Sequence, residues 1–320
     1  MALPRLAPLI LPFTRAELPG WHRLYRHVAG DGRHDDPAWR HAGHRTVRGK
    51  WHGYRMQLDL ADWSDRTAYF LGRYYETQVQ QAMLALLRPG DRVLDIGANT
   101  GMLTLLAAAA VGPHGRVDAF EPNPACCQRI RRQLDLNRIT HVHLHELALS
   151  DQPGHTDLHS VPTHTGFGTL APVGDAAKAT FTQTHRVAVA CGDDVLTTDV
   201  RPLRLVKIDV EGFECHALTG LRDTLLDHRP AIIGELNPYC LERAGRSARE
   251  LLGLLSSLGY AALEPRTAAS RWRERVVLHP LREGVVPEAT DLVWLPRERP
   301  WPTLQGGRVQ FAPPPARAAA

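Results

Sequence analysis

The chain has 320 residues, of which 43% are hydrophobic and 22% are charged, and its formal net charge is +4 with neutral histidines. This composition is typical of a globular protein, and so small a charge argues against a strongly basic surface for nucleic acid or membrane lipid. Five cysteines without a C-x-x-C pair exclude an ordinary disulfide framework and offer no zinc-ligand spacing.

The two ends of the chain carry little periodic pattern. Residues 1–70 are rich in Pro, Arg, His and Trp, and we interpret them as an N-terminal extension suited to act as a substrate lid. The apolar LAPLILPF stretch is short and interrupted by proline, which argues against a signal peptide or a membrane span and predicts a cytoplasmic protein. Residues 297–320 contain RPWP and APPPARAAA and are predicted to form a loose tail.

From residue 71 onward, helical periodicity alternates with short apolar runs of the kind found in buried parallel strands. In chain order the first half of the pattern predicts a helix over 76–87, a strand over 92–96, a helix over 102–111, a strand over 116–120, a helix that starts at Pro124 with Asn123 as its cap, and a strand over 141–147. An insertion over 151–200 is expected to hold short strands near 155–159 and 186–191 around a polar loop that includes Gly166, Phe167 and Gly168.

The second half continues the alternation. It predicts strands over 203–208 and 231–235, a helix over 213–225, a helix capped by Ser247 and Glu250, and a closing antiparallel pair at 276–278 and 292–295. Repeated strand–helix units with right-handed crossovers build a parallel sheet that has helices on both faces. The sequence therefore predicts an α/β fold with a doubly wound, mostly parallel, seven-stranded Rossmann-like sheet over 71–296.

The strongest chemical signal lies where the first of these strands ends, in VLDIGANTG. Gly97 and Gly101 allow a tight turn and a close approach of the backbone to a ligand at the start of the next helix. A dinucleotide site would need G-x-G-x-x-G, but Asn99 interrupts that pattern, and the carboxylate of Asp95 favours an ammonium over a phosphate. Glu121 ends the second strand, where a carboxylate can accept hydrogen bonds from both ribose hydroxyls. S-adenosylmethionine, which has an ammonium, a sulfonium and no phosphate, fits these features.

Several sequence blocks occur in a fixed order: YETQ, VLDIGANTG, FEPNP, ELALSD and VKIDVEGFE, followed by a strand that ends at Glu235. Over residues 70–240 this series resembles the FkbM-type methyltransferases, which use S-adenosylmethionine and mostly methylate hydroxyl oxygens. The resemblance implies a class I methyltransferase fold with S-adenosyl-L-methionine as cofactor. It also implies that the first loop holds the methionine part, that the second strand end holds the ribose, and that residues 148–149 lie against the adenine. The residues expected to bind the cofactor are Asp95, Gly97, Ala98, Asn99, Gly101, Glu121, Pro122, Ala148 and Leu149.

Four further residues are candidates for catalysis: Lys207, Asp209, Glu211 and Glu235. The block from Lys207 to Glu211 is expected to face the transferred methyl group. An unpaired ammonium inside a strand is unfavourable, so we expect Lys207 to have a partner, with Glu235 as the candidate. A structural ion pair would explain Lys207 equally well, and Asp209 could instead cap the following helix.

The ends of the fourth and fifth strands also suggest a metal alternative. Asp209, Glu235 and Asn237 resemble the oxygen-ligand set of magnesium-dependent catechol methyltransferases. Carboxylates are common at strand ends, so no metal ligand is predicted, and a divalent cation stays an alternative.

The leading hypothesis is a methyltransferase that acts on a hydroxyl oxygen of a small molecule or glycan by in-line transfer. An N-methyltransferase or RNA methyltransferase with the same cofactor site is the first alternative, and the lack of a basic patch interleaved with aromatic residues argues against RNA. A non-catalytic cofactor-binding protein is the second alternative, which the polar residues at the expected pocket edge disfavour. We expect no nucleic-acid or membrane partner. The sequence leaves a homo-oligomer open and does not identify the acceptor.

Overall fold

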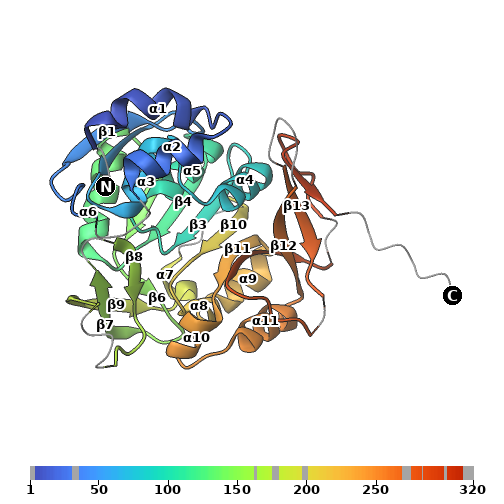
Figure 1. The fold of residues 1–320 in the computed structure, drawn as a ribbon. Helices are drawn as coiled ribbons and strands as arrows, with labels where there is room; N and C mark the ends of the chain where they lie inside the picture. The colour runs from blue at the N-terminus through green and yellow to red at the C-terminus, as the bar shows by residue number, and fades with distance from the viewer. Residues whose placement is uncertain are drawn as a thin grey trace.

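One large sheet organises the computed structural model, which describes residues 4–30, 36–161, 164–174, 180–196, 201–268, 275–282, 284–298 and 301–312 (Figure 1). In spatial order its strands are β15 (Val309–Phe311), β13 (Arg275–Pro280), β12 (Tyr260–Ala268), β14 (Thr290–Pro296), β11 (Ala231–Leu236), β10 (Leu203–Ile208), β3 (Arg92–Ile96), β4 (Arg116–Phe120) and β5 (Val142–His145). The five strands from β11 to β5 are parallel, and β14 and β12 are antiparallel additions to that core.

The predicted fold class is confirmed. The core of seven strands, β5 to β12, is the expected doubly wound, mostly parallel sheet, and β13 and β15 extend it to nine. The chain moves outward from β3 through β4 to β5, then returns to place β10 and β11 on the other side of β3. The strand order therefore reverses between β3 and β10, which is where sheets of this type bind ligands.

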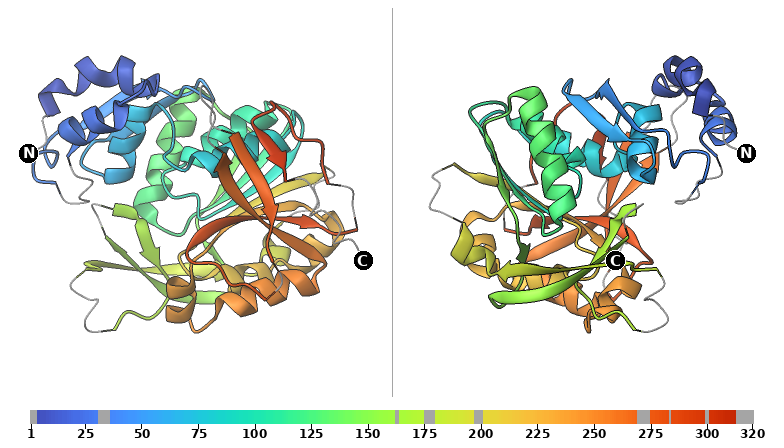
Figure 2. Two further views of the ribbon diagram at one scale, coloured as in Figure 1. Left: turned by 45° about the vertical axis from the view of Figure 1, so that its right-hand side comes forward. Right: turned by 90° about the vertical axis from the view of Figure 1, so that its left-hand side faces the viewer.

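Helices cover both faces of the sheet (Figure 2). The helices of one face are α4 (Thr77–Leu86), α5 (Met102–Val111) and α6 (Pro124–Asn137). Those of the other face are α8 (Glu214–Thr219), α9 (Arg222–His228), α10 (Pro238–Arg243) and α11 (Ala248–Ser257). Successive residues of a strand pack into the two hydrophobic cores in turn. In β3, Val93 packs against the first helix layer and Leu94 against the second.

Two helix caps that the sequence predicts are confirmed. The side chain of Asn123 accepts a hydrogen bond from the Ala125 amide, and Ser247 and Glu250 form a reciprocal capping box. The single helix expected over 213–225 is wrong, because the chain forms α8 and α9 with a break at Gly220. A Cβ at Gly220 would lie 2.0 Å from the carbonyl oxygen of Ser150, so only glycine allows this approach.

The N-terminal extension packs onto the first helix layer and shares its core. It consists of the 3-10 turn η1 (Pro4–Leu6), α1 (Ala7–Arg15), α2 (Trp21–Ala29), the antiparallel strands β1 (His44–Arg48) and β2 (Arg55–Asp59), and α3 (Trp63–Leu71). Trp39, Met56 and Phe70 are buried in the same cluster as residues of β3 and α5. Gln57 in β2 exchanges backbone hydrogen bonds with the side chain of Gln133 in α6. This part of the chain is thus continuous with the domain core.

The insertion forms a second, four-stranded sheet. Its strands, in spatial order, are β6 (Ala148–Leu149), β9 (Gln183–Ala190), β7 (Gly154–Val161) and β8 (His164–Thr169), and the short helix α7 (Gly192–Val195) follows β9. The expectation of a polar loop at Gly166–Gly168 is wrong, because these residues belong to β8. In Figure 1 this sheet lies below the N-terminal extension and beside the carboxyl ends of the central strands.

Two predictions for the C-terminal region are also corrected. Segments 276–278 and 292–295 do not pair with each other, because β12 lies between them and pairs with both. Part of the predicted loose tail is ordered: Val309 is buried, and β15 pairs with β13. Residues 313–320 of that predicted tail lie outside the described residues. Within the described chain, no helix has both the length and the apolar character needed to cross a membrane.

Candidate active site

The turn after β3 has a backbone path that only small or flexible residues permit. Gly97 has φ +78°, and a Cβ there would lie 1.9 Å from the carbonyl oxygen of Asp209. The amides of Gly97 and Ala98 both donate to the carbonyl oxygen of Phe120, each at 3.0 Å, which ties the turn to the end of β4. Gly101, at φ +83°, then starts α5. The first loop is therefore held close to two neighbouring strand ends.

Asp95 and Lys207 form a buried pair beneath this turn. They are direct neighbours in the register of β3 and β10, and the Lys207 Nζ lies 3.6 Å from Asp95 Oδ1. Lys207 also donates to the carbonyl oxygen of Gly97 at 2.9 Å and lies 3.9 Å from Asp209 Oδ2. Burial opposes the charge on Lys207, but the surrounding carboxylates outweigh it and raise the pKa of this ammonium. The expected pairing of Lys207 with Glu235 is thus wrong, and its partner is Asp95.

Glu121 stands at the end of β4 with both carboxyl oxygens anchored. Oε2 accepts from the Asn99 amide at 2.7 Å, and Oε1 accepts from the Asn123 amide at 2.8 Å. Burial is the main reason that the pKa of Glu121 rises to about 7, although these two hydrogen bonds act in the opposite direction. Each oxygen keeps a second lone pair, so the carboxyl group can also accept from a ligand.

The first cavity opens above this turn, with about 670 Å³ of space free of protein atoms. Six of the residues predicted to bind the cofactor line it: Gly97, Asn99, Glu121, Pro122, Ala148 and Leu149. Asp95, Ala98 and Gly101 are not among the described residues that line it, and their direct contact with a ligand stays a prediction. Asp95 is fully buried, and its Oδ2 accepts from the Thr104 hydroxyl at 2.6 Å, which makes it a positioning residue beneath the cavity.

Residues of the insertion complete the first cavity, although no sequence motif marks them. Leu158 of β7 and Thr165 and Gly168 of β8 line it together with Phe213. Thr165 is fixed to the N-terminal extension, because its amide and hydroxyl both donate to Asp62 Oδ2 at 3.2 Å. The insertion and the extension therefore meet at the wall of this cavity.

A second cavity, with about 900 Å³ of space free of protein atoms, adjoins the first. The two share Gly166, Asp209 and Glu211 as lining residues. Glu235 lines only the second cavity, and Lys207 lines neither. Of the four catalytic candidates, Asp209 and Glu211 thus stand at the junction, while Lys207 supports it from below.

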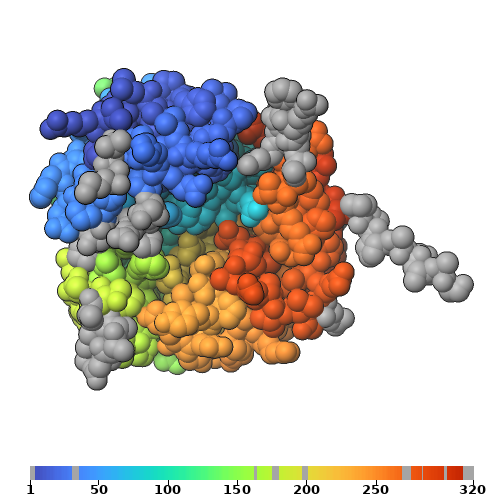
Figure 3. Space-filling view, in the orientation of Figure 1, coloured from blue at the N-terminus to red at the C-terminus, as the bar shows by residue number. Residues whose placement is uncertain are grey.

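Side chains from three distant regions form the walls of the second cavity. They are Trp63, Tyr74, Tyr75 and Glu76 from the segment before α4, His164 and Phe167 from β8, and Asp209, Glu211, Glu235 and Asp291 from the strand ends. In Figure 3 the blue N-terminal, yellow-green insertion and orange C-terminal regions converge on one face of the molecule. Trp63 and Asp291 were not foreseen, since only long-range packing brings them here, and the YETQ block that contains Tyr75 and Glu76 had been assigned no role.

The carboxyl groups of this cavity perturb one another. One oxygen each from Asp209, Glu211 and Glu235 lies within 4.8 Å of the others. Burial, followed by repulsion from Asp209, raises the pKa of Glu211 to about 8 and those of Glu235 and Asp291 to about 7. Such groups hold protons at neutral pH unless a cation lies beside them.

Asn237 is not a member of this cluster, and Asp209 is not a helix cap. The Asn237 Oδ1 accepts from the Cys240 amide and caps α10, so this oxygen is already engaged and the alternative magnesium ligand set of Asp209, Glu235 and Asn237 is not assembled. Glu214 accepts from the amides of Val210 and Gly212 ahead of α8. The alternative role of Asp209 as a cap is therefore wrong.

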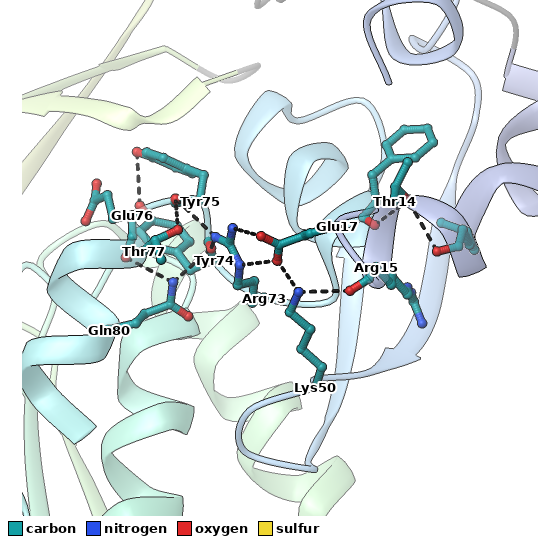
Figure 4. Close-up of polar contacts among 12 residues, drawn as sticks. Thr14, Arg15, Glu17, Lys50, Arg73, Tyr74, Tyr75, Glu76, Thr77 and Gln80 are labelled. Atoms are coloured by element: carbon teal, nitrogen blue, oxygen red, sulfur yellow. Dashed lines mark hydrogen bonds and ion pairs between the residues drawn. The ribbon is translucent and has the colours of Figure 1, made fainter. Parts of the chain in front are cut away.

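The segment that carries Tyr74, Tyr75 and Glu76 is held from both sides (Figure 4). The Arg73 guanidinium donates to both oxygens of Glu17, at 2.9 and 3.1 Å, and to the carbonyl oxygen of Tyr74 at 2.8 Å. Lys50 also binds Glu17. From the other side, Gln80 Nε2 donates to the carbonyl oxygens of Tyr74 and Glu76, at 2.8 and 3.0 Å. Glu17, which follows α1, thus helps to position the segment that forms one wall of the second cavity.

Comparison with known proteins places the chain in a family. A model described as the Methyltransferase FkbM domain matches residues 95–262, more than half of the chain. The chain is 28% identical over 159 residues to Methyltransferase 1 of Beauveria bassiana, with 45% of this chain and 64% of that protein covered. It is also 28% identical over 162 residues to the 31-O-demethyl-FK506 methyltransferase FkbM of Streptomyces tacrolimicus, with 43% and 62% covered. It thus spans somewhat less than two thirds of the length of these relatives.

Among solved structures, the methyltransferase FkbM from Methylobacillus flagellatus KT aligns with a TM-score of 0.38 and 19% identity, over 64% of this chain and 43% of that one. The family match runs from the end of β3 to the start of β12, and so contains the first loop, Glu121 and the Lys207–Glu211 block. The chain belongs to the FkbM methyltransferase family.

Proposed function

We propose that this chain transfers a methyl group from S-adenosylmethionine to a hydroxyl oxygen of a small molecule or glycan. The observation that carries the proposal is the junction of two cavities at Asp209 and Glu211. One cavity has the features of a nucleoside site, and the other has polar and aromatic walls suited to an acceptor. A methyl group at the junction would face both.

The residues of the first cavity fit this cofactor. Glu121 offers free lone pairs to ribose hydroxyls, and the apolar side chains of Phe120, Leu149 and Leu158 offer a slot for a flat adenine ring. The turn at Gly97 leaves room that a Cβ would fill. No lysine or arginine is among the described residues that line this cavity, which argues against a dinucleotide pyrophosphate. When bound, S-adenosylmethionine would supply an electrophilic methyl group on a positively charged sulfur.

The strand ends supply the remaining chemistry. With the cofactor bound, the acceptor oxygen would bond to the methyl carbon as the carbon–sulfur bond breaks with its electron pair left on sulfur, and the Asp209 carboxylate would accept the hydroxyl proton. Alignment of the reacting groups contributes up to about 7–11 kcal/mol in favourable cases, and a general base contributes about 10²–10⁴-fold. Lys207 acts as a positioning residue, because it holds Asp209 and the Gly97 carbonyl together. The lid role of residues 1–70 stays a prediction.

Calorimetry with S-adenosylhomocysteine and methyl transfer from labelled S-adenosylmethionine test the proposal. Glu121→Ala should weaken binding of S-adenosylhomocysteine at least about tenfold, since it removes a buried hydrogen-bonding group. Asp209→Asn should lower turnover about 10²–10⁴-fold while this affinity changes little. A wild-type chain that does not bind S-adenosylhomocysteine, or an equal fall of turnover and affinity in Asp209→Asn, would contradict the assignment.

A further inference from the structure

The second cavity holds an excess of acidic groups that methyl transfer does not require. Five carboxyl groups line it: Glu76, Asp209, Glu211, Glu235 and Asp291. No lysine or arginine is among the described residues that line it. Lys207, which lies below, binds Asp95 and the carbonyl oxygen of Gly97, and its charge also acts on Asp209, Glu76 and Asp291. The cluster is therefore not neutralised by the lining residues of the cavity.

The cofactor can account for only part of this charge. Asp209 and Glu211 line both cavities, so a sulfonium bound in the first cavity would lie near these two carboxyl groups. Glu76, Glu235 and Asp291 line the second cavity alone. Lys207 offsets part of the charge of Glu76 and Asp291, so these three acids either hold protons at neutral pH or share a further cation.

Two of these three acids stand directly opposite each other in the sheet. Glu235 of β11 and Asp291 of β14 are register partners across the antiparallel pair. Like charges in that position destabilise a sheet, and burial makes their repulsion stronger. The arrangement becomes favourable when a positive charge is held between the two side chains.

Aromatic rings line the same cavity as the acids. Trp63 packs against Tyr75 at a centroid distance of 5.0 Å and against His164 at 5.7 Å, and His164 stacks on Phe167 at 4.1 Å. Such rings cover the carbon skeleton of a ligand and attract a cation to their faces. Acids and aromatic rings in one cavity form a combination that binds organic ammonium groups.

We propose that the acceptor is an amino alcohol in the broad sense, a compound that carries a protonated amine as well as the hydroxyl group to be methylated. The inference rests on the proposed function, because it places the hydroxyl at Asp209. Glu76, Glu235 and Asp291 bind the ammonium, and the rings cover the carbon skeleton. An ammonium nitrogen has no free electron pair, so it directs methyl transfer to the oxygen.

The test compares amines with neutral isosteres on the full chain saturated with S-adenosylhomocysteine. The pairs are tyramine against 4-(2-hydroxyethyl)phenol, and glucosamine against glucose, titrated by calorimetry. The amine of a pair should bind about tenfold more tightly, the order expected of one charge-assisted hydrogen bond. The double variant Glu235→Gln/Asp291→Asn should lose that preference.

Asp157→Asn is the matched control, because it also removes a negative charge, from an exposed ion pair with Arg186 on the insertion. It should keep the preference for amines. The affinity for S-adenosylhomocysteine, measured first for every variant, shows whether the first cavity is intact.

Three outcomes would overturn the inference while binding of S-adenosylhomocysteine is retained. They are equal affinity within both pairs, no amine binding at millimolar concentration, and a preference that arises only with added magnesium chloride, which would assign the carboxylates to a metal. Loss of S-adenosylhomocysteine binding by the wild-type chain would instead overturn the proposed function.

Discussion

The two cavities that meet at Asp209 and Glu211 are lined by different parts of the chain. The floor of the first is formed by the turns at the ends of β3, β4 and β10, each a contiguous stretch of sequence, and the insertion completes its wall. The second is made of large side chains from Trp63 and the segment before α4, from β8, and from the strand ends, including the antiparallel strand β14. The floor of the cofactor site thus depends on local backbone geometry, whereas the acceptor site depends throughout on how distant segments pack.

Gly97→Ala should break the first cavity and give the largest effect. Its Cβ would lie 1.9 Å from the carbonyl oxygen of Asp209 at a φ of +78°, so the turn and β10 must separate. We expect S-adenosylhomocysteine to bind at least about 100-fold more weakly, as measured by calorimetry, because strain of this kind costs about 1–3 kcal/mol and also displaces the ligand contacts.

Gly245→Ala is the control, since Gly245 has a φ of +75° but no atom within 4 Å of an added Cβ. It should lower the free energy of unfolding by only about 1–2 kcal/mol and leave affinity for S-adenosylhomocysteine unchanged. Similar affinities in both alanine variants would mean that the close approach to Asp209 does not shape the cavity.

Glu17→Gln should loosen only the second cavity. The substitution removes the charge that Arg73 and Lys50 bind, so the segment over 74–76 loses a support. Hydrogen exchange measured by mass spectrometry should become about tenfold faster in peptides that cover 73–77, the effect of losing about 1.4 kcal/mol of local stability. Peptides that cover 95–101 should exchange at the wild-type rate.

Glu264→Gln removes a comparable carboxylate from an exposed pair with Arg266 on β12 and should leave both sets of peptides unchanged. Faster exchange over 95–101 in Glu17→Gln would show that the two cavities are mechanically coupled. It would contradict the view that separate parts of the chain support them.

Glu235→Gln should give the smallest effect, and one that depends on pH. The pKa of Glu235 is raised from 4.5 to about 7, so the folded chain binds this proton more tightly than the unfolded chain does. The resulting stability is present below about pH 4.5 and is lost as the pH rises through 7. Urea unfolding should therefore find the variant at least about 1 kcal/mol more stable than wild type at pH 8, and about equal to it at pH 4. A difference that is the same at both pH values would contradict a raised pKa.

The parts of the molecule that the sequence predicts best are those that local pattern determines. The bounds of β3, β4 and β10 agree with the predicted runs, because buried parallel strands are continuous apolar segments. β12 was missed because its sequence, YAALEPRTA, mixes apolar, charged and proline residues. Its place between β13 and β14 is decided by pairing, which leaves no local signature.

The same limit explains the site. Glu121 and the Gly97 turn were foreseen because they follow strands that could be recognised. Lys207 was assigned the wrong partner, since its contact with Asp95 depends on which strands are neighbours and on their register. Trp63 and Asp291 carried no signal, because each reaches the second cavity through long-range packing, and Tyr75 lies in the YETQ block, to which the sequence assigned no role.

Strand β8 separates the two cavities and contributes to both. Thr165 and Gly168 line the first, His164 and Phe167 line the second, and Gly166 borders each without a side chain. Substitutions at 164 and 167 can therefore alter the range of acceptors while the nucleoside site keeps its shape. Changes in this single strand would let such an enzyme accept new substrates, in evolution or in the laboratory, without changes to the site that binds the methyl donor.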